Sequence, residues 1–143
     1  MHYELVWFKR DLRWQDHAAL TEAAARGPVR CIYVVEPELW LQPDAALQHF
    51  EFVRESLEAL DHRLRQLGGC IEVHTGEMPD VLSKLWSEAP FSGLHSHQET
   101  GNGFSYERDV KVAQWCRAHG LAWREHAQFG VVRALKSRNT WLA

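Results

Sequence analysis

The chain has no long apolar run and no excess of basic residues. None of its hydrophobic stretches approaches the roughly 20 residues that a membrane-spanning helix needs, and Met1 to Glu4 lack the basic start of a secretory signal peptide. The formal net charge is -3, whereas a domain that binds DNA unaided is normally basic. These absences predict a cytoplasmic protein that makes no membrane contact and binds DNA poorly by itself.

Glycine-rich phosphate motifs are also missing. Neither G-x-G-x-x-G nor G-x-x-x-x-G-K-S/T occurs, so a dinucleotide or nucleoside triphosphate has no glycine-lined helix start to bind. Gly101-Asn102-Gly103 precedes an expected helix and could offer backbone N–H groups to an anion, although a flexible loop is the more common meaning of such a turn.

Cysteine is scarce and is not arranged for chemistry. Cys31, Cys70 and Cys116 lie far apart and form no C-x-x-C motif. Two of them begin apolar runs, where cysteine usually acts as a small buried hydrophobe in a reducing compartment. We therefore expect buried thiols rather than a nucleophile or a metal ligand.

The remaining composition is that of one globular domain. The chain has 143 residues, of which 45% are hydrophobic and 24% charged, enough to bury a sizeable core. Short runs rich in β-branched and aromatic residues alternate with helical patterns. Strands are expected at 5–8, 29–35, 70–74, 93–98 and 121–126. Helices are expected from Asp16 to Ala25, from Leu47 to Leu67, from Pro79 to Trp86 and from Ser105 to His119.

This alternation predicts an α/β fold with a doubly wound, five-stranded parallel sheet in the order 3-2-1-4-5, covered by helices on both faces in a Rossmann-like arrangement. In such sheets, ligands bind beyond the carboxyl ends of the strands, near the point where the winding reverses. That edge should carry charged and polar residues. The candidate cofactor-binding residues there are Lys9, Arg10, Val35, Glu36, His97 and Glu99.

Less specific roles compete with ligand binding at this edge. Arg10, Asp11 and Arg13 fit an ion-pair network that holds the loop after the first strand against a neighbouring domain, and we favour that interpretation for them. Glu36 and Glu99 could both face the crevice, but a solvated loop position is an equal alternative for each. Carboxylates that act as acid and base must converge in space, and their spacing in sequence does not show this.

Two histidines lie on one face of the expected fourth strand. His95 and His97 are two residues apart, as paired metal ligands often are. No third or fourth ligand is evident, because His74 belongs to a strand at the far edge of the predicted sheet. We therefore expect surface histidines, or one hydrogen-bonded beside a cleft.

Seven tryptophans are many for this length. Most fall at positions that suit a core, and packing is their expected role. These are Trp7, Trp86, Trp115 and Trp123, whereas Trp14 and Trp40 lie in or near expected loops.

The opening VWFKRDLRWQDHAAL resembles the start of the DNA photolyase/cryptochrome family, whose first strand and loop read W-F-R/K-R-D-L-R. The segments CIYVVEPELW, FVRESLEALDHRLRQLGG, VHTGEMPDVLSKL and YERD-V agree in turn, so the resemblance covers essentially the whole chain. It implies that residues 1–128 form the family's amino-terminal α/β domain. Residues 129–143 would begin the connector to a missing carboxyl-terminal helical domain.

In the family, that helical domain binds FAD and, in the repair enzymes, a flipped pyrimidine dimer. The resemblance thus implies part of a light-driven DNA photolyase, a carbon-carbon lyase that acts on DNA, with no catalytic residue in this chain. The alternative is the same domain of a cryptochrome, a blue-light receptor without repair activity. A more distant alternative is a free-standing nucleotide-binding module unrelated to light.

The family's α/β domain can also hold an antenna chromophore that passes excitation energy to FAD. Folate-binding members tend to carry an Asn-Glu pair where this chain has Phe104-Ser105, ahead of Tyr106-Glu107-Arg108-Asp109. Glu36 and Glu99 resemble acidic residues near the antenna of similar proteins. A deazaflavin, a flavin or a folate therefore remains open, as does the absence of an antenna.

Overall fold

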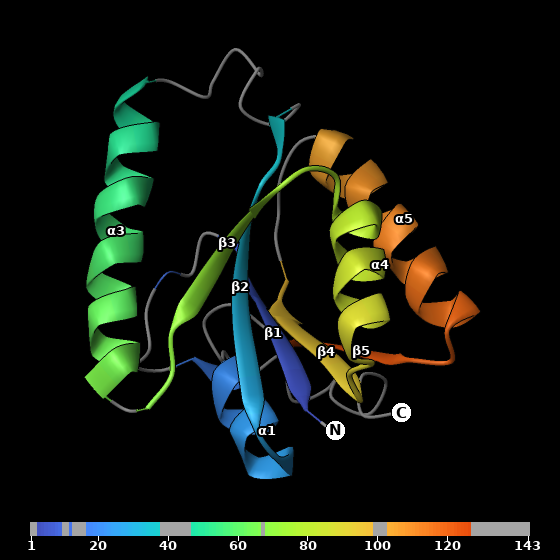
Figure 1. Ribbon diagram of the computed structural model, residues 1–143. Helices are drawn as coiled ribbons and strands as arrows, with labels where there is room; N and C mark the ends of the chain where they lie inside the picture. The colour runs from blue at the N-terminus through green and yellow to red at the C-terminus, as the bar shows by residue number, and fades with distance from the viewer. Residues whose placement is uncertain are drawn as a thin grey trace.

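The computed structural model describes residues 3–9, 12, 17–37, 47–66, 68–98 and 103–126. Five parallel strands form one sheet in the order β3-β2-β1-β4-β5 (Figure 1). The strands are β1 (Glu4–Phe8), β2 (Val29–Val35), β3 (Ile71–Thr75), β4 (Gly93–His97) and β5 (Ala122–His126). The predicted fold class and strand order are confirmed.

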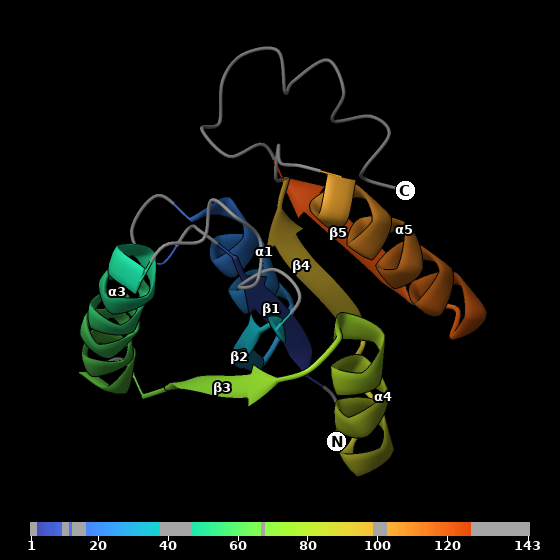
Figure 2. The same cartoon turned by 90° about the horizontal axis from the view of Figure 1, so that it is seen from above.

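Helices cover both faces of the sheet. Helices α1 (Ala18–Arg26) and α3 (Leu47–Gln66) lie on one face, and α4 (Met78–Glu88) and α5 (Gly103–Ala118) lie on the other (Figure 2). The chain winds outward from β1 to β3 and then returns past β1 to β4. Because parallel crossovers are right-handed, this reversal places the later helices on the opposite face.

Local sequence signals set the ends of the helices. Gly68 adopts φ 94° just after α3, a conformation that glycine takes without a Cβ penalty. Helix α1 begins after His17, whose Nδ1 accepts the Leu20 N–H at 3.0 Å. The predicted cap, Asp16, lies outside the described residues. In the described part of the chain, no helix is long and apolar enough to cross a lipid bilayer.

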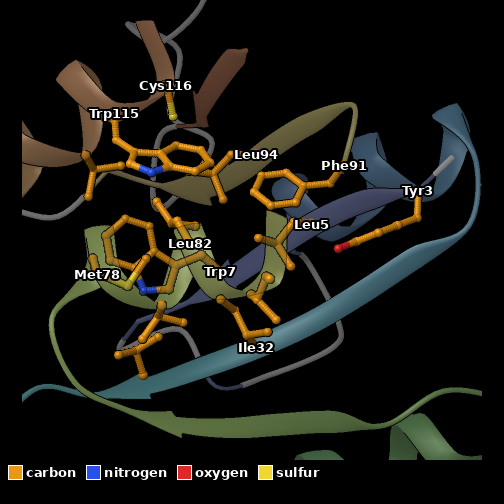
Figure 3. Packing of buried hydrophobic residues seen from close by; sticks show 14 residues of the cluster. Tyr3, Leu5, Trp7, Ile32, Met78, Leu82, Phe91, Leu94, Trp115 and Cys116 are labelled. Carbon is orange, nitrogen blue, oxygen red and sulfur yellow. The ribbon is translucent and has the colours of Figure 1, made fainter. Parts of the chain in front are cut away.

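Each face of the sheet has its own core, because alternate residues of a strand point to opposite sides. Leu5, Trp7 and Leu94 pack with Leu82 of α4 and Trp115 of α5, as Figure 3 shows. On the other face, a second cluster of strand residues packs against α1 and α3. Burying a leucine of this kind stabilises the fold by about 1.5–3 kcal/mol.

The buried side of α5 does not include every apolar residue of its sequence. Val112, Trp115 and Cys116 are buried, but Val110 is 39% exposed. Position 110 points away from the sheet, because it lies about half a turn from Val112 around the helix.

Cys31 and Cys116 are buried as the sequence indicates, whereas Cys70 is half-buried. Burial raises the pKa of Cys31 to about 12 and that of Cys116 to about 12. Both thiols therefore stay protonated near neutral pH, and the protonated form is a poor nucleophile and metal ligand. Their expected role as small buried hydrophobes fits these environments.

A buried Glu–His pair joins β1 to β4. His95 Nε2 lies 2.7 Å from Glu4 Oε1, and both residues are buried. Since a carboxylate only accepts hydrogen bonds, the ring carries its proton on Nε2 and donates it. Gly93 stands opposite Glu4 in the strand register, and a Cβ there would lie 2.6 Å from Glu4 Oε1 and 3.3 Å from His95 Nε2.

We therefore expect Gly93→Ala to lower the free energy of unfolding by about 2 kcal/mol, because the added methyl group displaces a buried hydrogen-bonded pair. Urea denaturation followed by circular dichroism measures the loss. Gly69→Ala is the matched control, since a Cβ at position 69 meets only Leu64 O at 3.8 Å. Equal stabilities of the two variants would contradict this account of Gly93.

Candidate functional site

Two charged side chains leave the carboxyl ends of β1 and β2 on the same face of the sheet. Lys9 follows Trp7 in the β1 alternation, and Glu36 follows Val34 in that of β2, so both point toward α4 and α5. Lys9 is 8% exposed and Glu36 is 5% exposed. Buried charges are costly unless they are paired, so this edge must supply partners.

Helix α5 supplies those partners from its first turns. Arg108 Nη1 donates to Glu36 Oε1 at 2.6 Å, and Arg108 Nε donates to Asp109 Oδ1 at 2.8 Å. The other Asp109 oxygen, Oδ2, lies 4.0 Å from Lys9 Nζ. The loops after β1 and β2 and the start of α5 are thus linked by one ion-pair network.

Trp7 lies beneath the two cations. Lys9 Nζ is 4.4 Å from the centre of the Trp7 ring, and Arg108 Cζ is 4.8 Å from it. Trp123 of β5 stands next to Trp7, with ring centres 6.1 Å apart, and its Nε1–H donates to Ser96 Oγ at 2.9 Å. Cations over an aromatic face are attracted by the ring electrons, so the indole helps to retain Lys9 and Arg108 in a buried position.

A third carboxylate, that of Glu125, lies near the same charged residues. Burial raises the pKa of Glu125 on β5, although the nearby Lys9 ammonium opposes the shift. The cations Lys9 and Arg108 face the carboxylates Glu36, Asp109 and Glu125. Among the described residues, the two cations of the cluster thus face three carboxylates, an arrangement that disfavours a bare phosphate and suits a neutral or hydrogen-bonding ligand.

A cleft of about 150 Å³ opens beside this network, between the carboxyl ends of β2 and β3 and the first turns of α4 and α5. Its polar lining includes Glu36, Arg108 and Lys111, and its apolar lining includes Met78 and Phe104. Drug-sized ligands usually occupy about 300–1,000 Å³. The cleft can therefore hold part of a planar ring system, and the Glu36–Arg108 pair lines its polar side.

The structure separates the six predicted site residues. Lys9 and Glu36 come together through Arg108 and Asp109, whereas Val35 and His97 point to the opposite face of the sheet. Val35 packs against α3, and His97 packs against His17 at the start of α1. Arg10 and Glu99 lie outside the described residues, as do Asp11, Arg13, Trp14, Trp40, Gly101 and Asn102. A solvated position for Glu36 is excluded by its burial.

The histidine prediction needs correction. His95 is 0% exposed and His97 is 1% exposed, so neither is a surface residue. With His17 and His126 they form a buried histidine cluster in which neighbouring ring centres lie 4.3 to 6.5 Å apart. Within the ranges that the structure describes, no three His, Cys, Asp or Glu side chains are placed to hold a metal ion.

Burial keeps two rings of this cluster neutral. It lowers the pKa of His95, outweighing the Glu4 carboxylate. It also lowers the pKa of His126 to about 4, and the neighbouring His97 and His95 add to the shift. His95 and His126 are therefore uncharged near neutral pH.

The sequence prediction did not place Arg108 and Asp109 in the site, although both belong to the YERD segment. A usable signal existed, because the first turns of a helix that follows a parallel strand lie at the carboxyl edge of the sheet. A buried Glu36 also requires a cation from somewhere in the chain. The cation that pairs with Glu36 could therefore have been expected among residues 107–109.

The fold defines a doubly wound α/β domain whose sequence lacks a glycine-rich phosphate loop. The family model described as DNA photolyase matches residues 4–138. The chain therefore belongs to the DNA photolyase/cryptochrome family and corresponds to its amino-terminal α/β domain.

Similar curated proteins include two from Gallus gallus. Cryptochrome-2 is 32% identical over 117 residues, which cover 80% of this chain and 20% of that protein. Cryptochrome-1 is 31% identical over 117 residues, covering 80% of this chain and 18% of that protein. The chain thus spans about a fifth of the length of these relatives.

Solved structures share the fold. A Synechocystis sp. cryptochrome matches with a TM-score of 0.81 at 20% identity, over 89% of this chain and 27% of that one. A class III photolyase from Agrobacterium tumefaciens matches with a TM-score of 0.77 at 26% identity, over 89% and 26%. An archaeal photolyase from Sulfolobus tokodaii, solved with two FAD molecules, matches with a TM-score of 0.77 at 24% identity, over 89% and 29%.

Proposed function

We propose that this chain is the antenna-side domain of a photolyase-like flavoprotein that acts in light-driven repair of pyrimidine dimers in DNA. The observation that carries the proposal is the buried Lys9–Glu36–Arg108–Asp109 network beside a cleft at the carboxyl edge of the sheet. Residues 129–143 would lead to a helical domain that binds FAD and DNA in the cytoplasm. The chain itself would contribute no catalytic residue.

The cleft suits the ring of an antenna chromophore better than a phosphate. Phe104 and Met78 offer apolar contact, and Glu36 and Arg108 offer an acceptor and a donor. Lys9 and Arg108 already face carboxylates, so an anionic tail would gain little from them. When bound, such a chromophore would absorb light and pass excitation energy to FAD. We favour a deazaflavin or flavin, with folate as the other candidate.

A second function has its own support. The curated relatives at 32% and 31% identity are cryptochromes, so the same domain could belong to a blue-light receptor without repair activity. The two functions differ in the helical domain rather than in this edge of the sheet. Expressing the whole coding region in cells that lack photolyase, and measuring survival after ultraviolet damage with and without blue light, separates them. Light-dependent survival supports repair, and equal survival supports the receptor.

Chromophore binding is tested directly by titrating the 143-residue chain with FAD, FMN, a deazaflavin and a reduced folate. We expect one of them to bind, seen as a change in its absorbance and fluorescence. Phe104→Ala should weaken that binding at least about tenfold by removing an aromatic wall of the cleft, a loss of about 1.4 kcal/mol.

Tyr106→Ala is the matched control, because Tyr106 is on the same helix, is 72% exposed and does not line the cleft. The two variants lose an aromatic ring from the same turn of α5 and should fold alike. Binding of none of the four compounds to the natural chain, or equal weakening by both variants, would contradict a chromophore site in this cleft.

A further inference from the structure

Strand β3 lies at the end of the sheet, with β2 as its only strand neighbour in the described ranges. Gly76 N–H donates to Val35 O at 3.0 Å, which shows how the β3 backbone is oriented. Because backbone groups of successive residues point to opposite edges of a strand, Glu72 and His74 direct theirs to β2. Ile71, Val73 and Thr75 direct theirs to the open edge.

Within the described ranges, only the start of this edge is protected, because the Ile71 N–H donates to Asp61 Oδ1 of α3 at 2.9 Å. Natural edge strands are commonly protected by lysine, proline, a bulge or a covering helix. The five residues of β3 read IEVHT and include neither lysine nor proline. Helix α3 covers a face of the sheet rather than this edge (Figure 2), and Val73 is 52% exposed.

The edge is complementary to itself. If two copies pair antiparallel about Val73, each Val73 faces its equivalent, and Glu72 of each copy faces His74 of the other. Since Val73 directs its backbone outward, the flanking Glu72–His74 pairs take the closer, non-hydrogen-bonded positions, at about 4.5 Å between Cα atoms. Arg30 holds the Glu72 carboxylate through Nε at 2.7 Å and Nη2 at 2.9 Å, and His74 Nε2 of the same chain lies 3.2 Å from Glu72 Oε1. Pairing would exchange this Glu72–His74 contact for the equivalent contact between the two copies.

Apolar surface continues from the edge onto α3. A groove of about 340 Å³ runs between α3 and the outer strands, lined among others by Val53, Leu57 and Val73. Phe52 on the same helix is 67% exposed. A two-fold axis perpendicular to the sheet keeps both α3 helices on one face. They would then approach each other over the junction and cover Phe52 and Val73.

We propose that two copies of this chain associate through their β3 edges, forming one continuous sheet from two five-stranded halves. Backbone hydrogen bonds from the Val73 and Thr75 N–H groups to the Val73 and Ile71 carbonyls of the other copy supply the association, and the Glu72–His74 cross-pairs set the antiparallel register. The dimer does not depend on the chromophore proposal, because no residue of the cleft takes part in it.

Sedimentation equilibrium of the 143-residue chain over a wide concentration range tests the association. We expect a reversible dimer, and we expect Val73→Lys to raise its dissociation constant at least about tenfold by placing two like charges opposite each other, equivalent to about 1.4 kcal/mol. Tyr106→Lys adds the same charge at an exposed position on α5 and should leave the dimer unchanged. A natural chain that stays monomeric at every concentration, or a dimer that tolerates Val73→Lys, would overturn the proposal.

Cross-linking tests the register. In a Cys70→Ser background, Val73→Cys should be joined into a covalent dimer by a short bifunctional methanethiosulfonate, whereas Val110→Cys on α5 should not. Circular dichroism confirms that both variants keep the fold. Efficient cross-linking at 110 and none at 73 would show that another surface forms the contact.

Discussion

Arg108→Leu is expected to lower the free energy of unfolding by about 3–5 kcal/mol, the cost of removing one partner from a buried ion pair. The Glu36 and Arg108 side chains are 6% and 5% exposed, and their contact is 2.6 Å. Without the guanidinium, Glu36 stays in a poorly solvated position and loses this ion pair. Lys9 also loses the neighbour that shares the Trp7 ring.

Urea denaturation of the natural chain and of Arg108→Leu, followed by far-ultraviolet circular dichroism, gives the difference. The control is Arg54→Leu, because Arg54 forms an ion pair with Glu58 at 3.0 Å that is 50% and 67% exposed. Exposed pairs contribute roughly 0–1 kcal/mol. Similar losses for the two leucine variants would contradict the assigned role of the buried pair.

The double variant Glu36→Leu/Arg108→Leu sharpens this test. Replacing both members of a buried ion pair with apolar residues is often neutral or stabilising. We expect the double variant to regain most of the stability that Arg108→Leu loses. A double variant as unstable as the sum of its single changes would show that Glu36 and Arg108 act independently.

Acidification from neutral pH to pH 4 is expected to destabilise the fold, and His126 should contribute about 3 kcal/mol of that loss. Burial holds the pKa of His126 at about 4 in the folded chain, against an ordinary 6.5. Below pH 6.5, His126 therefore binds a proton in the unfolded chain but not in the folded chain. Stability is complete above that value and falls as the pH drops toward the folded pKa.

His95 acts in the same direction, because burial lowers its pKa too. A proton on His95 or His126 would also lie beside the other histidines of the buried cluster. Glu4 is the carboxylate that directly contacts His95. Glu125 opposes the trend, since its raised pKa makes protonation favourable in the folded chain. The measured curve is therefore a sum, and a variant is needed to isolate His126.

His126→Phe is that variant, as it keeps an aromatic ring and removes the titration. The free energy of unfolding is measured in urea at several values from pH 7 to pH 4. Its total decrease over this range should be about 3 kcal/mol smaller in His126→Phe than in the natural chain. His62→Gln, an exposed change on α3, should keep the natural slope. A His126→Phe curve parallel to the natural one would refute the neutral, buried state of this histidine.

The strand order and the nature of the carboxyl edge could be read from local patterns. A strand in a doubly wound sheet is short and apolar and is followed by a helix of period 3.6, and each of these signals depends on residues close in sequence. Lys9 and Glu36 could be placed at that edge because each follows directly after such a strand. Whether they were solvated or buried could not be inferred, since burial depends on what packs over them.

The histidines show the same limit, that burial could not be inferred from the sequence. His95 and His97 share a strand face by simple alternation, and this was predicted correctly. Their burial follows from α1 lying over them and from His17 and His126 arriving from two other elements. No spacing within β4 contains that information.

Sequence alone determined the order of strands and helices, the parallel sheet and the edge at which charged residues gather, because these follow from periodicity and chain direction. Only the tertiary structure decided that Arg108 neutralises Glu36, that Trp7 lies beneath two cations and that four histidines share one buried space. Those contacts join residues from separate elements, 72 positions apart in the Glu36–Arg108 pair. Their energies arise from burial and distance, which exist only once the helices have packed on the sheet.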